Sequence, residues 1–262
     1  MCTLIALVGV VPGTPVVLAA NRDEMYERPS RAPALLAPGL VGGLDLRSGG
    51  SWLAIARDGR FAGVTNQREA VREVAPRSRG ELVVALAQRP DRAAMRAYVE
   101  ALDATQYASG NLLFGDASGV DVAYVRRAGT LELAPLGRGV HVLTNDRIGS
   151  PAFPKADHAA TRIASLLADG ADVAWPALRA ALPGILGDHA TPPPDRIPPL
   201  PDGSMIPPEL AATLQALCIH TPFYGTRSAT LAAIGGGGTE ALLWADGPPC
   251  TTPFVDAMPR YR

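Results

Sequence analysis

MCTLIALVGV (residues 1–10) begins the chain, and from Cys2 onward this apolar run is typical of a buried β-strand. The Pro12-Gly13 turn and the apolar run 15–20 complete a predicted hairpin with Cys2 at one end. Because an initiator Met is removed when the second residue is small, we expect the mature chain to begin at Cys2. The thiol nucleophile and the α-amine, a base with a pKa of about 7.7–8.0 in model compounds, then belong to one residue. The alternative is that Cys2 is a small buried hydrophobic residue.

Short apolar runs separated by turn residues continue along the chain. Asp58-Gly59 lies between two such runs and is a strong hairpin signal, and 116–119 joins another pair. Besides the first two, the predicted strands are 51–57, 60–65, 111–116, 120–125, 140–144, 226–234 and 239–244. Ser78 and Asp91 are predicted to cap helices at 82–88 and 92–102. Two more helices are predicted at 155–168, ending at Gly170, and at 175–182.

The predicted helices form two blocks and do not alternate with the strands. This order favours an α+β fold of antiparallel sheets covered by helices over a doubly wound parallel sheet. Residues 26–50, rich in Pro, Gly and Arg, are predicted to be loop with at most a short strand near Leu40. Residues 191–208 contain eight prolines and are predicted to be an irregular loop, and the tail 247–262 is also predicted to be irregular. We expect one domain that spans residues 1–262.

Composition excludes several classes of function. Formal net charge is −1, from 24 basic and 25 acidic residues, so nothing favours nucleic acid or an anionic lipid surface. Three scattered cysteines are too few for a disulfide framework and fit a reducing cytoplasm. The first apolar run lacks a basic flank and is too short to span a bilayer, so we expect a cytoplasmic protein without stable membrane insertion. The oligomeric state is not predicted.

Polar residues follow several predicted strands in a similar pattern. Ala20–Asp23, Val64–Arg68 and Leu143–Arg147 are three such ends, and the last two share the spelling Thr-Asn-x-Arg. In a fourth place, Gly225–Thr230, an Arg begins an apolar strand. A single Asn at a strand end often only caps a turn, and coincidence is the alternative here. Two identical motifs after core strands favour a shared site.

These residue types suit acyl transfer to a thiol. Asn66 and Asn145 could donate N–H groups to the oxyanion that forms when a carbonyl is attacked. Arg22 and Arg227 could favour the thiolate, and Asp23 could hold the terminal amine. No histidine is required, because the α-amine of an N-terminal nucleophile can carry the proton itself.

The motifs resemble those of the NRDE family, also named the transport and Golgi organisation protein 2 family. The resemblance covers essentially the whole chain and rests on Cys2 and on these motifs in order: Asn21–Glu24, Gly49–Leu53, Val64–Arg68, Ser78–Gly80, Leu143–Arg147 and Tyr224–Ser228. It implies an N-terminal-nucleophile (Ntn) hydrolase fold, in which two antiparallel sheets packed face to face are flanked by helices in an αββα stack.

Within that superfamily the chain resembles the choloylglycine hydrolase and penicillin V acylase group. This implies Cys2 as nucleophile and base, with the other catalytic positions at Arg22, Asp23, Asn66, Asn145 and Arg227. Substrate contacts are expected from Asn21, Glu24, Trp52, Arg68 and Arg147. In that group the Asp typically follows the Arg by three residues, whereas Asp23 follows Arg22 directly. Adjacent strand residues face opposite sides, so Glu24 is an alternative partner for the amine.

The expected activity is hydrolysis of a linear amide C–N bond in a small molecule. The alternative is a carrier of haem, acyl-CoA or lipid on the same fold, which is what roles proposed for the family resemble. Cys218 and His220, His141 or His158 are weak candidates for haem ligands. No metal site and no cofactor are predicted, because Cys218 and Cys250 lack the paired spacing of zinc ligands.

Overall fold

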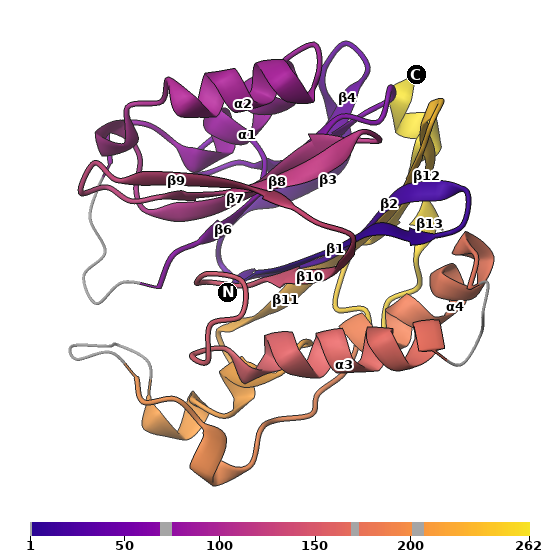
Figure 1. Ribbon diagram of the computed structural model, residues 1–262. Coiled ribbons are helices and arrows are strands. Elements are labelled where there is room, and N and C mark those ends of the chain that lie inside the picture. The colour runs from indigo at the N-terminus through magenta and orange to yellow at the C-terminus, as the bar shows by residue number, and fades with distance from the viewer. Residues whose placement is uncertain (1, 69–74, 169–172, 201–206) are drawn as a thin grey trace.

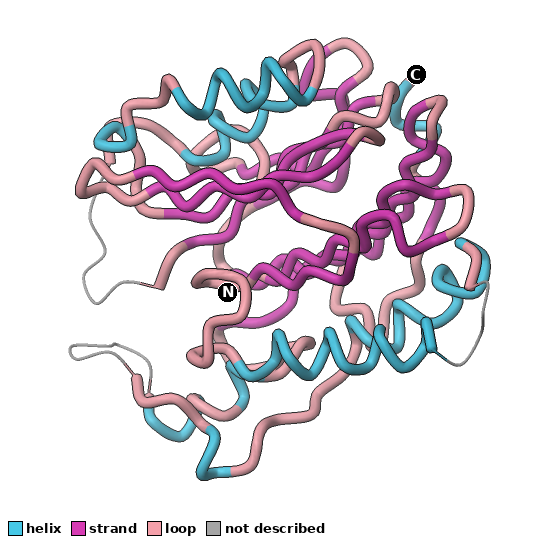
Figure 2. Tube along the Cα trace, in the orientation of Figure 1, coloured by secondary structure: helices cyan, strands magenta, loops and turns pink. Residues whose placement is uncertain are grey.

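Two antiparallel sheets face each other, and helices cover the outer face of each sheet (Figure 1, Figure 2). The structure, a computed structural model, describes residues 2–68, 75–168, 173–200 and 207–262. Its layers are those of the predicted αββα sandwich, so the predicted fold class is confirmed. Within the described ranges, no helix is both long enough and apolar enough to cross a membrane.

One sheet, here called sheet A, has six strands in the order β10-β1-β2-β11-β12-β13. Their bounds are β1 Thr3–Val11, β2 Thr14–Met25, β10 Gly139–Leu143, β11 Tyr224–Gly235, β12 Gly238–Ala245 and β13 Val255–Asp256. Helices α3 (Pro154–Ala168) and α4 (Trp175–Leu186) pack on its outer face (Figure 1).

The other sheet, sheet B, runs in chain order from β3 to β9. Its strands are β3 Ser30–Ala37, β4 Leu40–Asp45, β5 Leu53–Ala56, β6 Phe61–Asn66, β7 Gly110–Asp116, β8 Gly119–Val125 and β9 Leu131–Leu136. Helices α1 (Arg79–Ala87) and α2 (Arg92–Glu100) cover it. Short 3-10 turns lie at Ala104–Gln106, Pro194–Arg196, Pro208–Leu210, Thr213–Gln215 and Met258–Tyr261.

The first strand shows why its sequence is apolar throughout. Leu4 and Ala6 point into the core between the sheets, whereas Ile5 and Leu7 pack against α3 and α4 on the other side. Because both faces are buried, no polar residue alternates with the apolar ones. Complete burial of one such Leu or Ile side chain contributes about 1.5–3 kcal/mol.

The helix caps act as the sequence predicts. Ser78 accepts a hydrogen bond from the Gly80 N–H at 3.1 Å, and Asp91 accepts one from Ala94 at 2.8 Å. The helix at 155–168 is confirmed, but its predicted end at Gly170 lies outside the described residues. Helix α4 is one turn longer than predicted, because Leu182, Ile185 and Leu186 are all buried against sheet A.

The prediction of loop at 26–50 is wrong except near Leu40, where the expected short strand is β4. This segment forms β3, the edge strand of sheet B, and β4, which pairs with β3 and with β5. Gly43 permits this, because a Cβ there would lie 2.2 Å from the Trp52 ring. Strand β9 was not predicted either, and the tail contains β13 and a 3-10 turn. Edge strands with Pro, Gly and charged residues carry little apolar pattern, so backbone pairing with neighbours determines them.

Strand β2 also differs from the prediction in a way that matters for the site. The polar residues Asn21–Glu24 do not follow the strand but lie within it, since β2 pairs with β11 as far as Met25↔Tyr224. Their side chains therefore alternate between the two faces of sheet A. Arg22 faces sheet B, and Asn21 and Asp23 face the helical layer.

Candidate active site

The strand register places Cys2 between two predicted partners. Cys2 lies directly before β1, whose pairing Thr3↔Asn21 brings Arg22 to one side. On the other side the pairing Leu4↔Leu143 brings Asn145 toward Cys2. The Cys2 thiol donates to the Asp23 carbonyl oxygen across 3.9 Å. Burial raises the pKa of this thiol, the Asp23 carboxylate raises it further, and the Arg22 guanidinium opposes both effects.

Arg22 is held on the inner face by three groups, from β3, from β4 and from the segment just before β5. Its guanidinium carbon lies 4.3 Å from the centre of the Trp52 ring. One terminal nitrogen donates to the Ser30 hydroxyl at 3.3 Å, and the other lies 3.7 Å from an Asp45 oxygen. The side chain is 3% exposed, so a fixed cation lies beside the thiol. Trp52, predicted to contact substrate, supports Arg22 in this structure.

Asp23 lies on the opposite, outer face of β2. One carboxylate oxygen accepts a hydrogen bond from the Thr226 hydroxyl at 2.7 Å, and the other lies 3.8 Å from Nζ of Lys155. Burial raises the pKa of Asp23, and the Lys155 ammonium and the Thr226 hydroxyl oppose that rise. Glu24 points elsewhere, with one oxygen 3.6 Å from Arg28. Asp23 is therefore the carboxylate placed next to Cys2.

Lys155 is a site residue that the sequence did not reveal. It lies in the first turn of α3, and neither its side chain nor that of Asp23 is exposed. Burial lowers the pKa of Lys155, and the nearby Asp23 and Cys2 groups oppose this. The available signal was that Lys155 is the only lysine in a chain with 24 basic residues. No spacing along the sequence connects it to Cys2.

The two Thr-Asn motifs meet, although they belong to different sheets. The Asn145 amide donates to the Asn66 carbonyl oxygen at 2.7 Å, and the Thr65 hydroxyl donates to the Thr144 carbonyl. Asn111 is fully buried and donates to the Thr65 hydroxyl at 3.1 Å. Asn111 therefore braces the junction and is a second residue missed from the sequence. Asn145 keeps a further N–H beyond the one bonded to Asn66.

The remaining predicted residues lie in different places. Arg68 is close to the site, because its backbone N–H donates to the Asn145 carbonyl at 2.7 Å and its guanidinium covers the Phe153 ring at 4.5 Å. Arg147 points away, pairs with Glu132 and covers the Tyr124 ring at 4.6 Å.

Two of the predicted site residues, Arg227 and Asn21, donate hydrogen bonds to backbone carbonyls of the protein itself. Arg227 donates to the carbonyls of Met25 and Tyr26 at 3.1 and 2.7 Å, so it secures the end of β2. Asn21 is buried, and its amide donates to the carbonyls of Leu186 and Leu217 at 2.8 and 2.9 Å. Since both amide hydrogens are used on these loops, Asn21 is bound to the protein and does not face a ligand.

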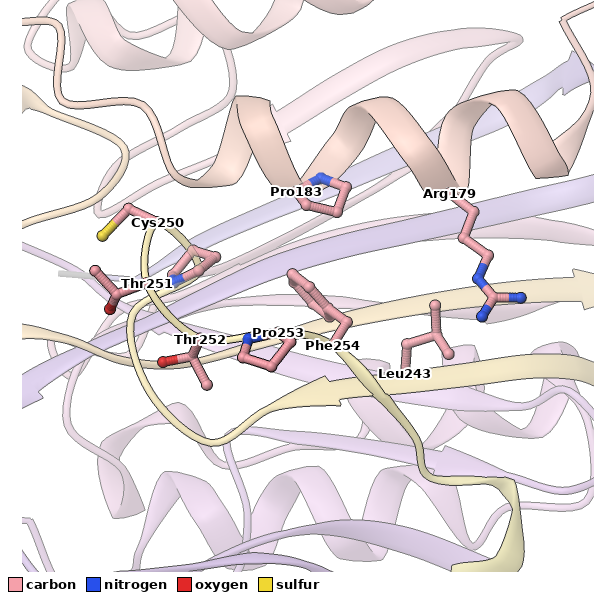
Figure 3. Close-up of a pocket in the computed structure, with 9 residues that line it drawn as sticks. Arg179, Pro183, Leu243, Cys250, Thr251, Thr252, Pro253 and Phe254 are labelled. Carbon is pink, nitrogen blue, oxygen red and sulfur yellow. The ribbon is translucent and has the colours of Figure 1, made fainter.

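A surface pocket of about 470 Å³ lies elsewhere, between α4 and the segment after β12 (Figure 3). Cys250 is at one end of it and Arg179 at the other, with Phe254 between them (Figure 3). None of the residues predicted to act with Cys2 lines this pocket.

A sequence model of the family described as Transport and Golgi organisation 2 matches residues 1–240. The chain is 29% identical over 232 residues to the Transport and Golgi organization protein 2 homolog of Bos taurus, which covers 85% of this chain and 83% of that protein. It is 28% identical over 239 residues to the homolog from Homo sapiens, with the same coverage.

Two solved structures with the same sandwich are named as hydrolytic enzymes. A conjugated bile acid hydrolase from Clostridium perfringens superposes with a TM-score of 0.57 at 10% identity, covering 98% of this chain and 92% of the enzyme. An N-acylethanolamine-hydrolyzing acid amidase ortholog from Caenorhabditis elegans gives a TM-score of 0.54 at 10% identity, with 90% and 93% covered. At these identities the likeness shows the fold. The chain belongs to the Transport and Golgi organisation 2 family and has the sandwich fold of Ntn hydrolases.

Proposed function

We propose that the mature protein is a cysteine amidohydrolase that cleaves a linear amide of a small molecule by acyl transfer to Cys2. The observation that carries this proposal is the register of β1, which sets Arg22 and Asn145 on either side of Cys2. Of two hydrolases with this fold, one is named for a conjugated bile acid and the other is named an N-acylethanolamine-hydrolyzing acid amidase, and the second name favours amide hydrolysis here.

Each step has a group to perform it. The Cys2 thiolate, favoured by the Arg22 cation, attacks the amide carbonyl, and the α-amine of Cys2 takes the thiol proton. Asn145 and Asn66 donate to the oxyanion. As the C–N bond breaks, the α-amine returns the proton to the leaving amine, which leaves an acyl thioester on Cys2. Water then attacks the thioester, and the thiol and a carboxylic acid are released.

We place this activity in the reducing cytoplasm, where thiols persist. No cofactor has a part in the mechanism. The carrier alternative, haem or an acyl thioester bound without turnover, predicts ligand binding that survives Cys2→Ala.

The test is intact mass spectrometry followed by labelling with a β-lactone. We expect a mass without Met1 and a single acyl adduct on Cys2, absent in Cys2→Ala and unchanged in the control His141→Asn, which keeps all three cysteines. A mature protein that retains Met1, or an adduct that persists in Cys2→Ala, would refute the proposal.

A further inference from the structure

Two cysteines and two histidines converge on the outer side of sheet A. They are His189, just after α4, Cys218 and His220, just before β11, and Cys250, just after β12. One potential ligand atom from each lies within 4.8 Å of all the others. The two sulfur atoms are 3.6 Å apart, and Nε2 of His220 lies 3.2 Å from the Cys250 sulfur and 3.7 Å from the Cys218 sulfur.

The separations among Cys218, His220 and Cys250, 3.2–3.7 Å, are close to those of a tetrahedral Cys2His2 zinc site, and the ligand atom of His189 lies within 4.8 Å of the other three. With Zn–S of about 2.3 Å and Zn–N of about 2.0–2.1 Å, tetrahedral ligand atoms lie about 3.3–3.8 Å from one another. Thiolate and imidazole are also the donors that this ion prefers. We propose that His189, Cys218, His220 and Cys250 bind one Zn²⁺ ion per chain.

Backbone hydrogen bonds and a close backbone contact orient the four side chains for metal binding. Nδ1 of His189 lies 2.9 Å from the Cys218 carbonyl oxygen, to which it donates, so Nε2 of the same ring carries the free lone pair. The Cys218 N–H in turn donates to the Asp188 carbonyl at 2.8 Å. Gly187 lets the third segment approach, because a Cβ there would lie 3.1 Å from backbone atoms of Cys250. Three distant segments are thus fixed around one point.

This arrangement explains why the sequence predicted no metal site. That prediction relied on paired spacing of Cys218 and Cys250, but the ligands come from separate loops and meet only through the fold. The arrangement also differs from a haem site. Four potential donors lie within 4.8 Å of one another, whereas a haem takes two axial ligands from the protein.

The zinc site would also hold the loop that positions Asp23. The N–H of Ile219, between two of the ligands, donates to the Thr226 hydroxyl at 2.9 Å, and this hydroxyl donates to Asp23 at 2.7 Å. Asn21 holds the residues before the same loops through Leu186 and Leu217. The ion is therefore structural, with four protein ligands and no open position, and it stabilises the outer support of β2.

The test measures zinc in the full-length protein purified under reducing conditions. We expect elemental analysis to find about one zinc per chain, because four protein ligands complete a structural zinc site. Replacement by Co²⁺ should give the visible bands of a tetrahedral site and a sulfur-to-cobalt charge-transfer band. Cys250→Ser and His220→Asn should weaken zinc binding about 100-fold or more against a chelating dye, since even losses in the outer shell cost 10–100-fold.

Matched controls keep all four ligands. Cys2→Ala removes another thiol and His141→Asn another histidine, and both should retain one zinc. The inference is overturned if the reduced wild-type protein takes up no zinc, if its cobalt spectrum is octahedral, or if a Cys218–Cys250 disulfide forms in place of metal binding. Should a ligand variant fail to fold, the wild-type stoichiometry and cobalt spectrum still decide. Neither depends on Cys2 labelling, so this inference and the proposed amidase activity can fail separately.

Discussion

The two faces of strand β2 carry polar residues of opposite kinds, although they come from one continuous stretch of sequence. On the inner face Arg22 is in contact with Trp52 and with Asp45, whose side chain is 15% exposed. On the outer face Asp23 is paired with Lys155, and neither side chain is exposed. The inner face offers a cation to the thiol, whereas the outer face anchors the strand through buried charges and hydrogen bonds. A run of adjacent polar residues therefore performs two separate tasks.

Breaking the Asp23–Lys155 pair on the outer face should have the largest effect on the free energy of unfolding. Lys155→Met removes a buried cation from Asp23, and loss of one partner of a buried ion pair costs about 3–5 kcal/mol of unfolding free energy. Urea unfolding followed by tryptophan fluorescence measures this change.

The double variant Lys155→Met/Asp23→Asn tests the cause. It removes both charges, so it should recover much of the lost stability. If the double variant is as unstable as Lys155→Met, the loss comes from packing of the lysine stem and not from the charge on Asp23.

The site residues on the inner face of β2 were easier to predict from the sequence than those on its outer face. Cys2 and the two Thr-Asn motifs lie at strand ends, Arg22 lies three residues before the end of β2, and the two antiparallel sheets bring these positions together. The hairpins and helix caps were also predictable, because their signals are local. Lys155, Asn111 and the four proposed zinc ligands depend on contacts between segments far apart in the chain. Strands β3, β4 and β9 were missed for a related reason, because hydrogen bonds to neighbouring strands stabilise them more than their own apolar pattern does.

A change on the inner face should alter reactivity more than stability. Arg22→Gln removes the cation beside Cys2, so the thiol pKa should rise further and alkylation of Cys2 by iodoacetamide near neutral pH should slow, by up to about tenfold. Peptide mass spectrometry of timed samples measures the rate at Cys2 alone.

Arg22→Lys is the control for charge, because it keeps a cation at the same position and should react closer to the wild-type rate. Equal slowing in both variants would show that the shape of the guanidinium, stacked on Trp52, matters and that its charge does not.

The smallest effect is expected at Asp45, the acid that lies behind the inner-face arginines. Burial acts to raise the pKa of Asp45. Hydrogen bonds from Arg28 and from the backbone N–H groups of Ser48 and Arg47 nevertheless hold this pKa below its usual value. A depressed folded-state pKa means that the ionised form stabilises the fold. This stability is present above the unfolded pKa of about 3.9 and is lost as the pH falls through the folded pKa.

Asp45→Asn should therefore cost about 1 kcal/mol at pH 7, since the group is partly exposed, and progressively less below pH 4. Urea unfolding at pH 7, 5 and 3.5 measures the difference from wild type. In an Arg28→Gln background the pH dependence of that difference should shrink, because Arg28 supplies the closest contact, 2.7 Å from the Asp45 oxygen. A difference that stays constant with pH would mean that Asp45 acts as a neutral hydrogen-bond acceptor. The inner face would then be held without charge pairing, which would remove the contrast with the buried Asp23–Lys155 pair.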